Sequence, residues 1–128
     1  MQALGRQVLL ELYDCDAEAL SDEALLREAF LDAARLAGAT VVTDVFHRFS
    51  PYGVSGVVVI AESHLSVHTW PEHGYAAVDL FTCGHVDPWE IEAALRKVLR
   101  PGSVSMVELR RGLVSAHNTK GVEGQSTV

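Results

Sequence analysis

The stretch TVVTDVFHRFSPYGVSGVVVIA, residues 40–61, decides the fold. Residues 40–49 and 54–61 are rich in β-branched and aromatic side chains, which favour strands. The segment Ser50-Pro51-Tyr52-Gly53 between them consists of turn-forming residues. Two strands joined by a short turn predict a hairpin, so at least part of the sheet is expected to be antiparallel.

Further strands are expected on both sides of this hairpin. They cover residues 4–14, 65–69, 75–82 and 103–109. Two helices complete the pattern. Ser21 is expected to cap the first, which begins at Asp22 and Glu23 and ends at Gly38. Asp87 is expected to cap the second, which takes Pro88 as its first residue and ends near Arg100.

The element order β-α-β-β-β-β-α-β predicts an α+β protein. A two-layer sandwich, with both helices on one face of a mainly antiparallel sheet, accommodates runs of strands between only two helices. The length of 128 residues predicts one domain, residues 1–128. The tail from about residue 115 lacks apolar periodicity and is expected to be mobile. The uncovered sheet face favours a homo-oligomer.

The composition excludes several classes of partner. A formal net charge of -7 argues against nucleic acid and anionic membranes, which bind proteins through an excess of Lys and Arg. No apolar run approaches membrane-spanning length, and charged residues interrupt the N-terminal runs. We therefore expect a soluble cytoplasmic protein, in which Cys15 and Cys83 are free thiols.

The reactive side chains gather after the hairpin, in ESHLSVHTWPE (residues 62–72) and FTCG (residues 81–84). These stretches combine hydroxyl, imidazole, carboxylate and thiol groups between strand-forming runs. Taken alone, Ser63 is typical of a turn and Cys83 of a small buried apolar residue. Their combination predicts a functional site at this edge of the scaffold.

The residues alone are compatible with two other kinds of chemistry. A zinc site would use four ligands: His64, His68, Cys83 and His85. Residues four apart on a strand are about 13 Å apart, so this site needs loops that fold back, and we expect no metal. In the second reading, Cys83 is a nucleophile with His68 as its base, as in thiol hydrolases.

Three segments carry a family resemblance: PYGVSG (residues 51–56), residues 62–72, and DLFTCG (residues 79–84). Together they resemble the prokaryotic S-adenosylmethionine decarboxylase proenzymes, and the likeness runs from Leu4 to about Arg111. The resemblance implies a pyruvoyl enzyme that decarboxylates S-adenosylmethionine for spermidine and polyamine synthesis. It also implies self-cleavage between Glu62 and Ser63 into fragments 1–62 and 63–128.

The resemblance assigns roles to four residues of the site. Ser63 attacks the Glu62 carbonyl and becomes the pyruvoyl group, which binds the substrate as a Schiff base. Ser55 assists the processing intermediate, and His68 removes the α-proton of Ser63. Cys83 donates the proton that completes decarboxylation. This chemistry uses neither a metal nor pyridoxal phosphate.

Substrate contacts and assembly also follow from the resemblance. The family pattern places Phe49 against the adenine and Glu72 on the ribose hydroxyls of S-adenosylmethionine. It implies a homodimer whose active sites lie at the interface, with Ser63 and Cys83 from one protomer. The partner supplies the remaining residues: Phe49, Ser55, His68 and Glu72. His73, His85 and His117 stay without an assigned role.

The sequence leaves two alternatives for function. The first is a pyruvoyl enzyme that decarboxylates a basic amino acid, arginine or ornithine; Phe49 and Glu72 argue against it. The second is a non-catalytic subunit that binds a ligand or activates a partner. The joint presence of Ser63, His68 and Cys83 argues against this second alternative.

Overall fold

The computed structural model describes residues 2–114, so His117 and the tail expected to be mobile lie outside it. Its six strands form one sheet in the order β2-β3-β4-β5-β1-β6, and every neighbouring pair is antiparallel. The strands are β1 (Gln2–Tyr13), β2 (Val41–Arg48), β3 (Val54–Ile60), β4 (Ser63–Trp70), β5 (Tyr75–Thr82) and β6 (Ser103–Val114). The helical segments are α1 (Ala17–Leu20), α2 (Glu23–Leu36), α3 (Pro88–Leu99) and the single 3-10 turn η1 (Pro71–His73).

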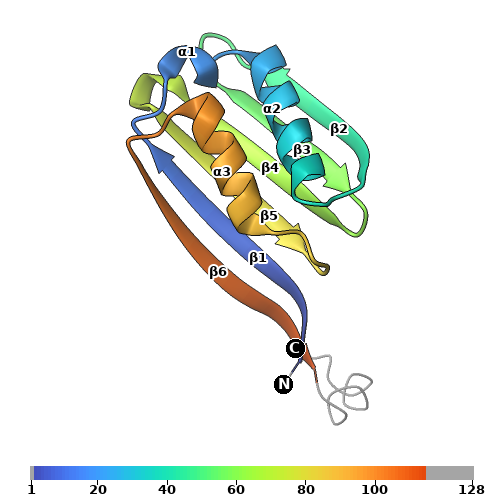
Figure 1. Ribbon diagram of the computed structural model, residues 1–128. Coiled ribbons are helices and arrows are strands. Elements are labelled where there is room, and N and C mark those ends of the chain that lie inside the picture. Colours follow the sequence, from blue (N-terminus) through green and yellow to red (C-terminus); the bar gives the residue numbers. More distant parts are fainter. Residues whose placement is uncertain (1, 115–128) are drawn as a thin grey trace.

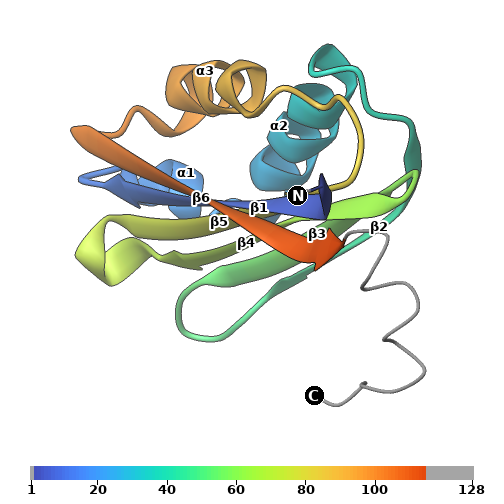
Figure 2. The same cartoon turned by 90° about the horizontal axis from the view of Figure 1, so that it is seen from below.

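The α-helices cover one face of the sheet and leave the other open (Figure 1, Figure 2). This arrangement confirms the predicted α+β two-layer sandwich. The core lies between the layers, because alternate strand residues such as Val8, Leu65 and Val78 point toward Phe30 of α2 and Leu95 of α3. Burial of these apolar side chains contributes about 25 cal/mol for each Å² removed from water.

The first predicted helix begins one residue later than expected. Asp22, not Ser21, is the cap of α2, since its Oδ1 accepts the Leu25 N–H at 3.0 Å. Ser21 instead closes α1, and its hydroxyl donates to the Ala17 carbonyl at 3.0 Å. Helix α1 was not predicted, because four residues are too few to show a helical period.

Two strands are longer than the sequence pattern indicated. Strand β6 was expected to end at Leu109 but continues to Val114, with Gln2 of β1 opposite Val114. Polar residues and Gly112 interrupt the apolar pattern there, while the backbone pairing continues. Strand β4 likewise begins at Ser63, two residues before its expected start.

The open face carries exposed apolar side chains. The strand registers place Val45, Val59, Val107 and Leu109 on this face, and Val107 is 51% exposed. Val45 and Val59 lie near one edge of the sheet, on β2 and β3, whereas Val107 and Leu109 lie at the opposite edge, on β6. In the part of the chain that the structure describes, no helix is both long and apolar enough to cross a membrane.

Candidate active site

The Glu62-Ser63 junction lies in the tight turn between β3 and β4. Ile60 pairs with Ser63, so only Ala61 and Glu62 make the turn. Glu62 has φ +65°, a left-handed conformation that costs a non-glycine residue on the order of 1–3 kcal/mol. The Ser63 hydroxyl donates to the carbonyl oxygen of Glu62 in a very short contact. A nucleophilic oxygen therefore lies beside the carbonyl of the peptide bond that precedes it.

Cys83 reaches the same carbonyl from the neighbouring strand. Ser63 pairs with Thr82, the last residue of β5, so Cys83 follows directly at this edge. Its Sγ lies 3.2 Å from the Glu62 carbonyl oxygen and 3.5 Å from Glu62 Oε1. The thiol is exposed and can donate a weak hydrogen bond to an oxygen that gains negative charge. The arrangement suits nucleophilic attack by Ser63 on Glu62.

A second group of polar residues lies at the other end of β4. Ser55 pairs with His68 across β3 and β4, and the Ser55 Oγ to His68 Nδ1 distance is 2.8 Å. His68 is exposed on the open face. A hydroxyl that contacts one ring nitrogen orients the imidazole, so the pair can take or deliver a proton.

A pocket of about 410 Å³ adjoins this pair. Phe49, Ser55, His68 and Glu72 all line it, and the Phe49 side chain is half exposed. Gly53 also lines the pocket: its φ is +91°, and a Cβ there would lie 2.8 Å from the Thr69 carbonyl oxygen. The turn can approach β4 this closely because residue 53 has no side chain.

Two aromatic residues of the pocket were missed in the sequence. Tyr52 and Trp70 line it beside Phe49. Trp70 stacks on Tyr75, with ring centroids 5.3 Å apart, and Tyr75 stacks on Tyr13 at 5.5 Å. Burial and a hydrogen bond to Glu11 raise the pKa of Tyr75 to about 12. The sequence could have indicated Trp70 and its partner Tyr75, because these two aromatic residues flank the short turn between β4 and β5.

The two groups do not meet within one chain. Ser63 and His68 are five residues apart on one strand, about 17 Å at 3.3 Å per residue. Ser63 and Cys83 are thus brought together, as are Ser55, His68, Phe49 and Glu72, but each group occupies its own end of the sheet. The sequence resemblance placed these groups in different protomers, which stays a prediction.

Comparison with known proteins decides the family. The family model described as S-adenosylmethionine decarboxylase matches residues 6–112. The chain belongs to this family. The match confirms the resemblance drawn from residues 51–56, 62–72 and 79–84.

Curated relatives and solved structures extend this finding. An S-adenosylmethionine decarboxylase proenzyme of Thermotoga petrophila is 56% identical over 113 residues, 88% of this chain and 87% of the relative. A proenzyme of Acidithiobacillus ferrooxidans is 51% identical over 115 residues, 89% of this chain and 86% of the relative. The adenosylmethionine decarboxylase structure from Aquifex aeolicus has a TM-score of 0.81 at 34% identity, covering 91% of this chain and 97% of that one.

A more distant structure shares the fold alone. The Trypanosoma brucei AdoMetDC-delta26 monomer has a TM-score of 0.62 at 16% identity. It covers 80% of this chain but only 45% of the trypanosome chain. The two-layer fold of this decarboxylase-family chain therefore matches a part of a longer polypeptide.

The zinc arrangement considered from the sequence does not form in this family member. Among residues 2–114, no three His, Cys, Asp or Glu side chains are grouped to hold a metal ion. His64 packs against the Phe81 ring, with centroids 6.0 Å apart, while His68 contacts Ser55. The strand keeps the two imidazoles apart, as its period requires.

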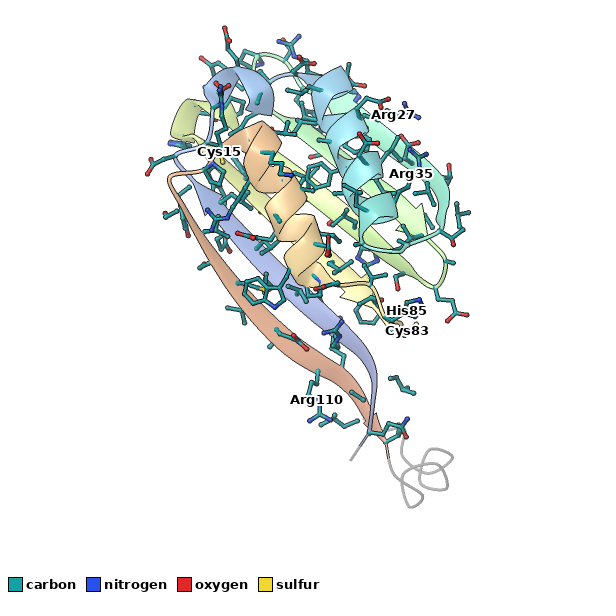
Figure 3. The ribbon with its side chains drawn as sticks, viewed as in Figure 1. Cys15, Arg27, Arg35, Cys83, His85 and Arg110 are labelled. Atoms are coloured by element: carbon teal, nitrogen blue, oxygen red, sulfur yellow. The ribbon has the colours of Figure 1, made fainter. Side chains whose placement is uncertain are left out.

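The two thiols of the decarboxylase-family chain differ in environment. Cys15 and Cys83 are both free and lie near opposite ends of β5, because the Cys15 N–H donates to the Gly74 carbonyl and Cys83 follows Thr82 (Figure 3). Burial, together with the charge of Asp14, raises the pKa of the Cys15 thiol to about 11. Because the thiolate is the reactive form, Cys15 is inert at neutral pH and the exposed Cys83 is the accessible thiol.

Proposed function

We propose that this chain decarboxylates S-adenosylmethionine, and thereby supplies the aminopropyl donor for spermidine and polyamine synthesis, after it cuts itself between Glu62 and Ser63. The observation that carries the proposal is the convergence of the Ser63 hydroxyl and the Cys83 thiol on one carbonyl oxygen. This convergence occurs in a chain whose family match spans residues 6–112. The cytoplasmic location expected from the sequence is part of the proposal.

The processing reaction begins at the turn. Ser63 Oγ forms a bond to the Glu62 carbonyl carbon, the peptide C–N bond breaks, and the nitrogen takes the hydroxyl proton, which leaves an ester. The Cys83 thiol faces the oxygen on which charge develops, as an oxyanion donor does. The left-handed turn at Glu62 is relieved when the chain opens.

The second processing step needs a base. His68 removes the Ser63 α-proton, the ester bond breaks by elimination, and Glu62 becomes the carboxyl end of fragment 1–62. Water then replaces the nitrogen at residue 63, which leaves as ammonia, and a pyruvoyl group remains. This group supplies a ketone that takes up the substrate amine and withdraws electrons as CO₂ departs, without a metal or pyridoxal phosphate. Ser55 orients the imidazole through its contact with Nδ1.

The distance between the two groups supports a homodimer. His68 cannot reach Ser63 of its own chain across about 17 Å of strand. Two copies that pack their open faces about a two-fold axis would bring Ser63 and Cys83 of one to Ser55 and His68 of the other. The exposed apolar side chains on this face, Val107 among them, would then be buried.

The pocket at the other end of β4 suits the adenosyl group. Its volume of about 410 Å³ falls in the range of small-molecule sites. The exposed Phe49 ring offers a stacking face for adenine, and the Glu72 carboxylate can accept hydrogen bonds from ribose hydroxyls. The net charge of -7 favours the encounter with a cationic sulfonium.

Release of CO₂ from carboxyl-labelled substrates tests the proposal. S-adenosylmethionine is expected to turn over, whereas arginine and ornithine are not. Turnover of an amino acid with an inert adenosyl substrate would instead favour the first alternative, and no turnover at all would favour a non-catalytic subunit. The family match supports the adenosyl substrate over both alternatives.

A further inference from the structure

The segment that carries Cys83 has no regular secondary structure. Residues 83–87 join β5 to α3 without a helix or strand. Under the proposed function, the Cys83 thiol must deliver its proton to one of two carbon atoms that share the same electron pair. A displacement of about 1 Å in such a group can cost on the order of a hundredfold in rate. The contacts that fix this segment therefore bear on catalysis.

Both ends of the segment are fixed locally. Thr82, which is 1% exposed, accepts the Gly84 N–H on its Oγ1 at 3.0 Å. Asp87 caps α3, and its Oδ1 accepts the Trp89 N–H at 2.9 Å. Between these ends, the Val86 side chain is buried in the core, and the Val86 carbonyl oxygen accepts a hydrogen bond from Arg6 Nη2 at 3.1 Å.

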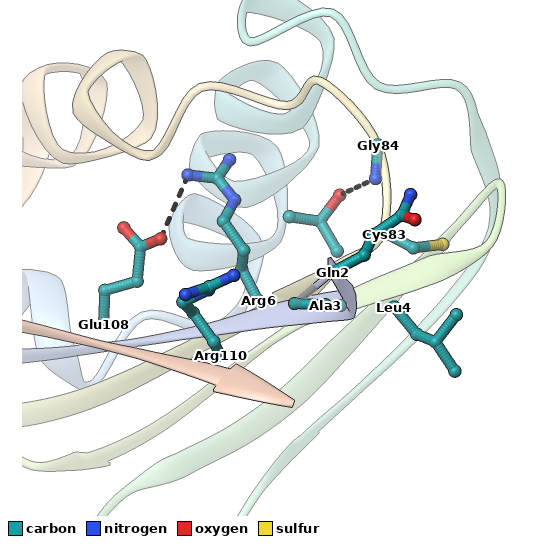
Figure 4. A pocket seen from close by; sticks show the side chains of 10 residues that line it. Gln2, Ala3, Leu4, Arg6, Cys83, Gly84, Glu108 and Arg110 are labelled. Atoms are coloured by element: carbon teal, nitrogen blue, oxygen red, sulfur yellow. Dashed lines mark hydrogen bonds and ion pairs between the residues drawn. The ribbon is translucent and has the colours of Figure 1, made fainter. Parts of the chain in front are cut away.

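Arg6 connects this carbonyl to the sheet. It lies on β1, opposite Thr82 of β5, and its Nη1 lies 3.4 Å from Glu108 Oε2 of β6. Figure 4 shows the Arg6 side chain beside Glu108 in the pocket that Cys83 also lines, whose volume is about 370 Å³. The planar guanidinium can hold a carboxylate and a carbonyl at once in a fixed geometry, which a lysine ammonium cannot.

We propose that Arg6 is a positioning residue for Cys83. It holds the Val86 carbonyl and so fixes residues 83–87 relative to β1, which sets where the thiol proton is delivered. This inference rests on the proposed function, because it names the residue that controls the proton donor of that same site. A role in stability alone would be slight, since an exposed ion pair such as that with Glu108 stabilises little.

Misplacement of the proton has a chemical signature. Loss of CO₂ produces an electron pair that two carbon atoms share. One is the substrate carbon that carried the carboxylate, and the other is the carbon of residue 63 that carried the ketone. A proton added to the substrate carbon, followed by water, releases the amine and restores the ketone at residue 63. A proton added to the residue 63 carbon, followed by water, releases an aldehyde and keeps the nitrogen, so that residue 63 becomes alanine.

The test compares Arg6→Met and Arg6→Lys with the parent chain and with Arg35→Met. Arg35 is a matched control because it forms an exposed ion pair with Asp32 on α2, away from Cys83 (Figure 3). Arg6→Met is expected to lower kcat between about tenfold and a hundredfold, with little change in KM. It is also expected to raise the fraction of 63–128 fragments with an alanyl end, measured by mass after equal turnovers. Arg6→Lys should have a kcat and an alanyl fraction between those of Arg6→Met and the parent chain.

Amide hydrogen exchange gives a readout that needs no pyruvoyl group. In chains kept whole by Ser63→Ala, adding Arg6→Met is expected to speed exchange at residues 84–86, whereas adding Arg35→Met is not. If Arg6→Met failed to fold, Glu108→Gln would serve instead, since it weakens the second contact of the guanidinium. Wild-type kcat, wild-type alanyl fraction and unchanged exchange in Arg6→Met would overturn the role of Arg6. An inert parent chain would overturn the proposed function itself.

Discussion

The Sγ atom of Cys83 lies 3.2 Å from the carbonyl oxygen of Glu62, the same oxygen that accepts a hydrogen bond from the Ser63 hydroxyl. The pairing of β4 with β5 produces this contact, because Ser63 lies opposite Thr82 and Cys83 is the next residue. Under the proposed function, one thiol would therefore serve twice, first at the bond that breaks during processing and then at the group that forms from Ser63.

Ser63→Ala is expected to leave the chain whole. The substitution removes the only hydroxyl beside the Glu62 carbonyl in the described turn and leaves the backbone free to keep its conformation. Gel electrophoresis of purified, aged protein should show a single band. Ser66→Ala is the matched control, since Ser66 lies on the same strand but contacts Asp79, and this variant should still be cut.

Cys83→Ala is expected to separate processing from turnover. Loss of an oxyanion donor costs on the order of a hundredfold, and a thiol is a weak donor, so processing should slow by about tenfold and still finish. Decarboxylation should lose its normal outcome, and alanyl ends should accumulate on the 63–128 fragment. A variant that is cut and then turns over at the wild-type rate would remove Cys83 from the mechanism.

Mixed dimers are expected to restore activity that neither parent has. In Cys83→Ala mixed with Phe49→Ala, one of the two shared sites of each mixed dimer has both residues intact. Random exchange makes half the dimers mixed, so about a quarter of the wild-type activity should return. If each site is instead built within one chain, mixing will recover nothing.

Stability is expected to fall between pH 9 and 11 because of Cys15. Burial raises the pKa of this thiol from 9.0 to about 11 in the folded chain. Below pH 9 the thiol is protonated in the folded and the unfolded chain, and its contribution to the free energy of unfolding is fully present. As the pH rises toward 11, the unfolded chain loses the proton first, and about 2–3 kcal/mol of unfolding free energy is lost.

Denaturant unfolding of the uncut Ser63→Ala chain at a series of pH values measures this loss. Adding Cys15→Ala should flatten the change between pH 9 and 10. The Tyr75 hydroxyl, whose pKa rises from 10.0 to about 12, enters only above that window. Tyr75→Phe should therefore leave the decline between pH 9 and 10 as it is, and a decline that persists without Cys15 would contradict the assignment.

The fold and the reactive turn could be predicted from sequence because both depend on local pattern. The hairpin of β2 and β3 follows from β-branched runs around a turn, and the Glu62-Ser63 junction lies between two such runs. Helix α1 and the far end of β6 were missed, since short helices and backbone pairing leave no side-chain period. The role of Arg6 was also not visible, because Glu108 and the Val86 carbonyl are distant in sequence and depend on the packing of β1, β6 and the 83–87 segment.

The separation of the site residues into two groups could not be predicted from the sequence pattern. Ser63 and His68 look like neighbours in the sequence, yet the extended strand places them about 17 Å apart. Only the register of β3, β4 and β5 shows that Ser63 contacts the Cys83 end of the sheet and His68 contacts Ser55.

The intact mass of the purified wild-type protein tests the central claim most directly. Self-processing predicts two polypeptides, residues 1–62 with a free carboxyl end at Glu62 and residues 63–128 with a pyruvoyl group in place of Ser63. A single chain with the full mass of 128 residues, unchanged after prolonged incubation, would contradict it.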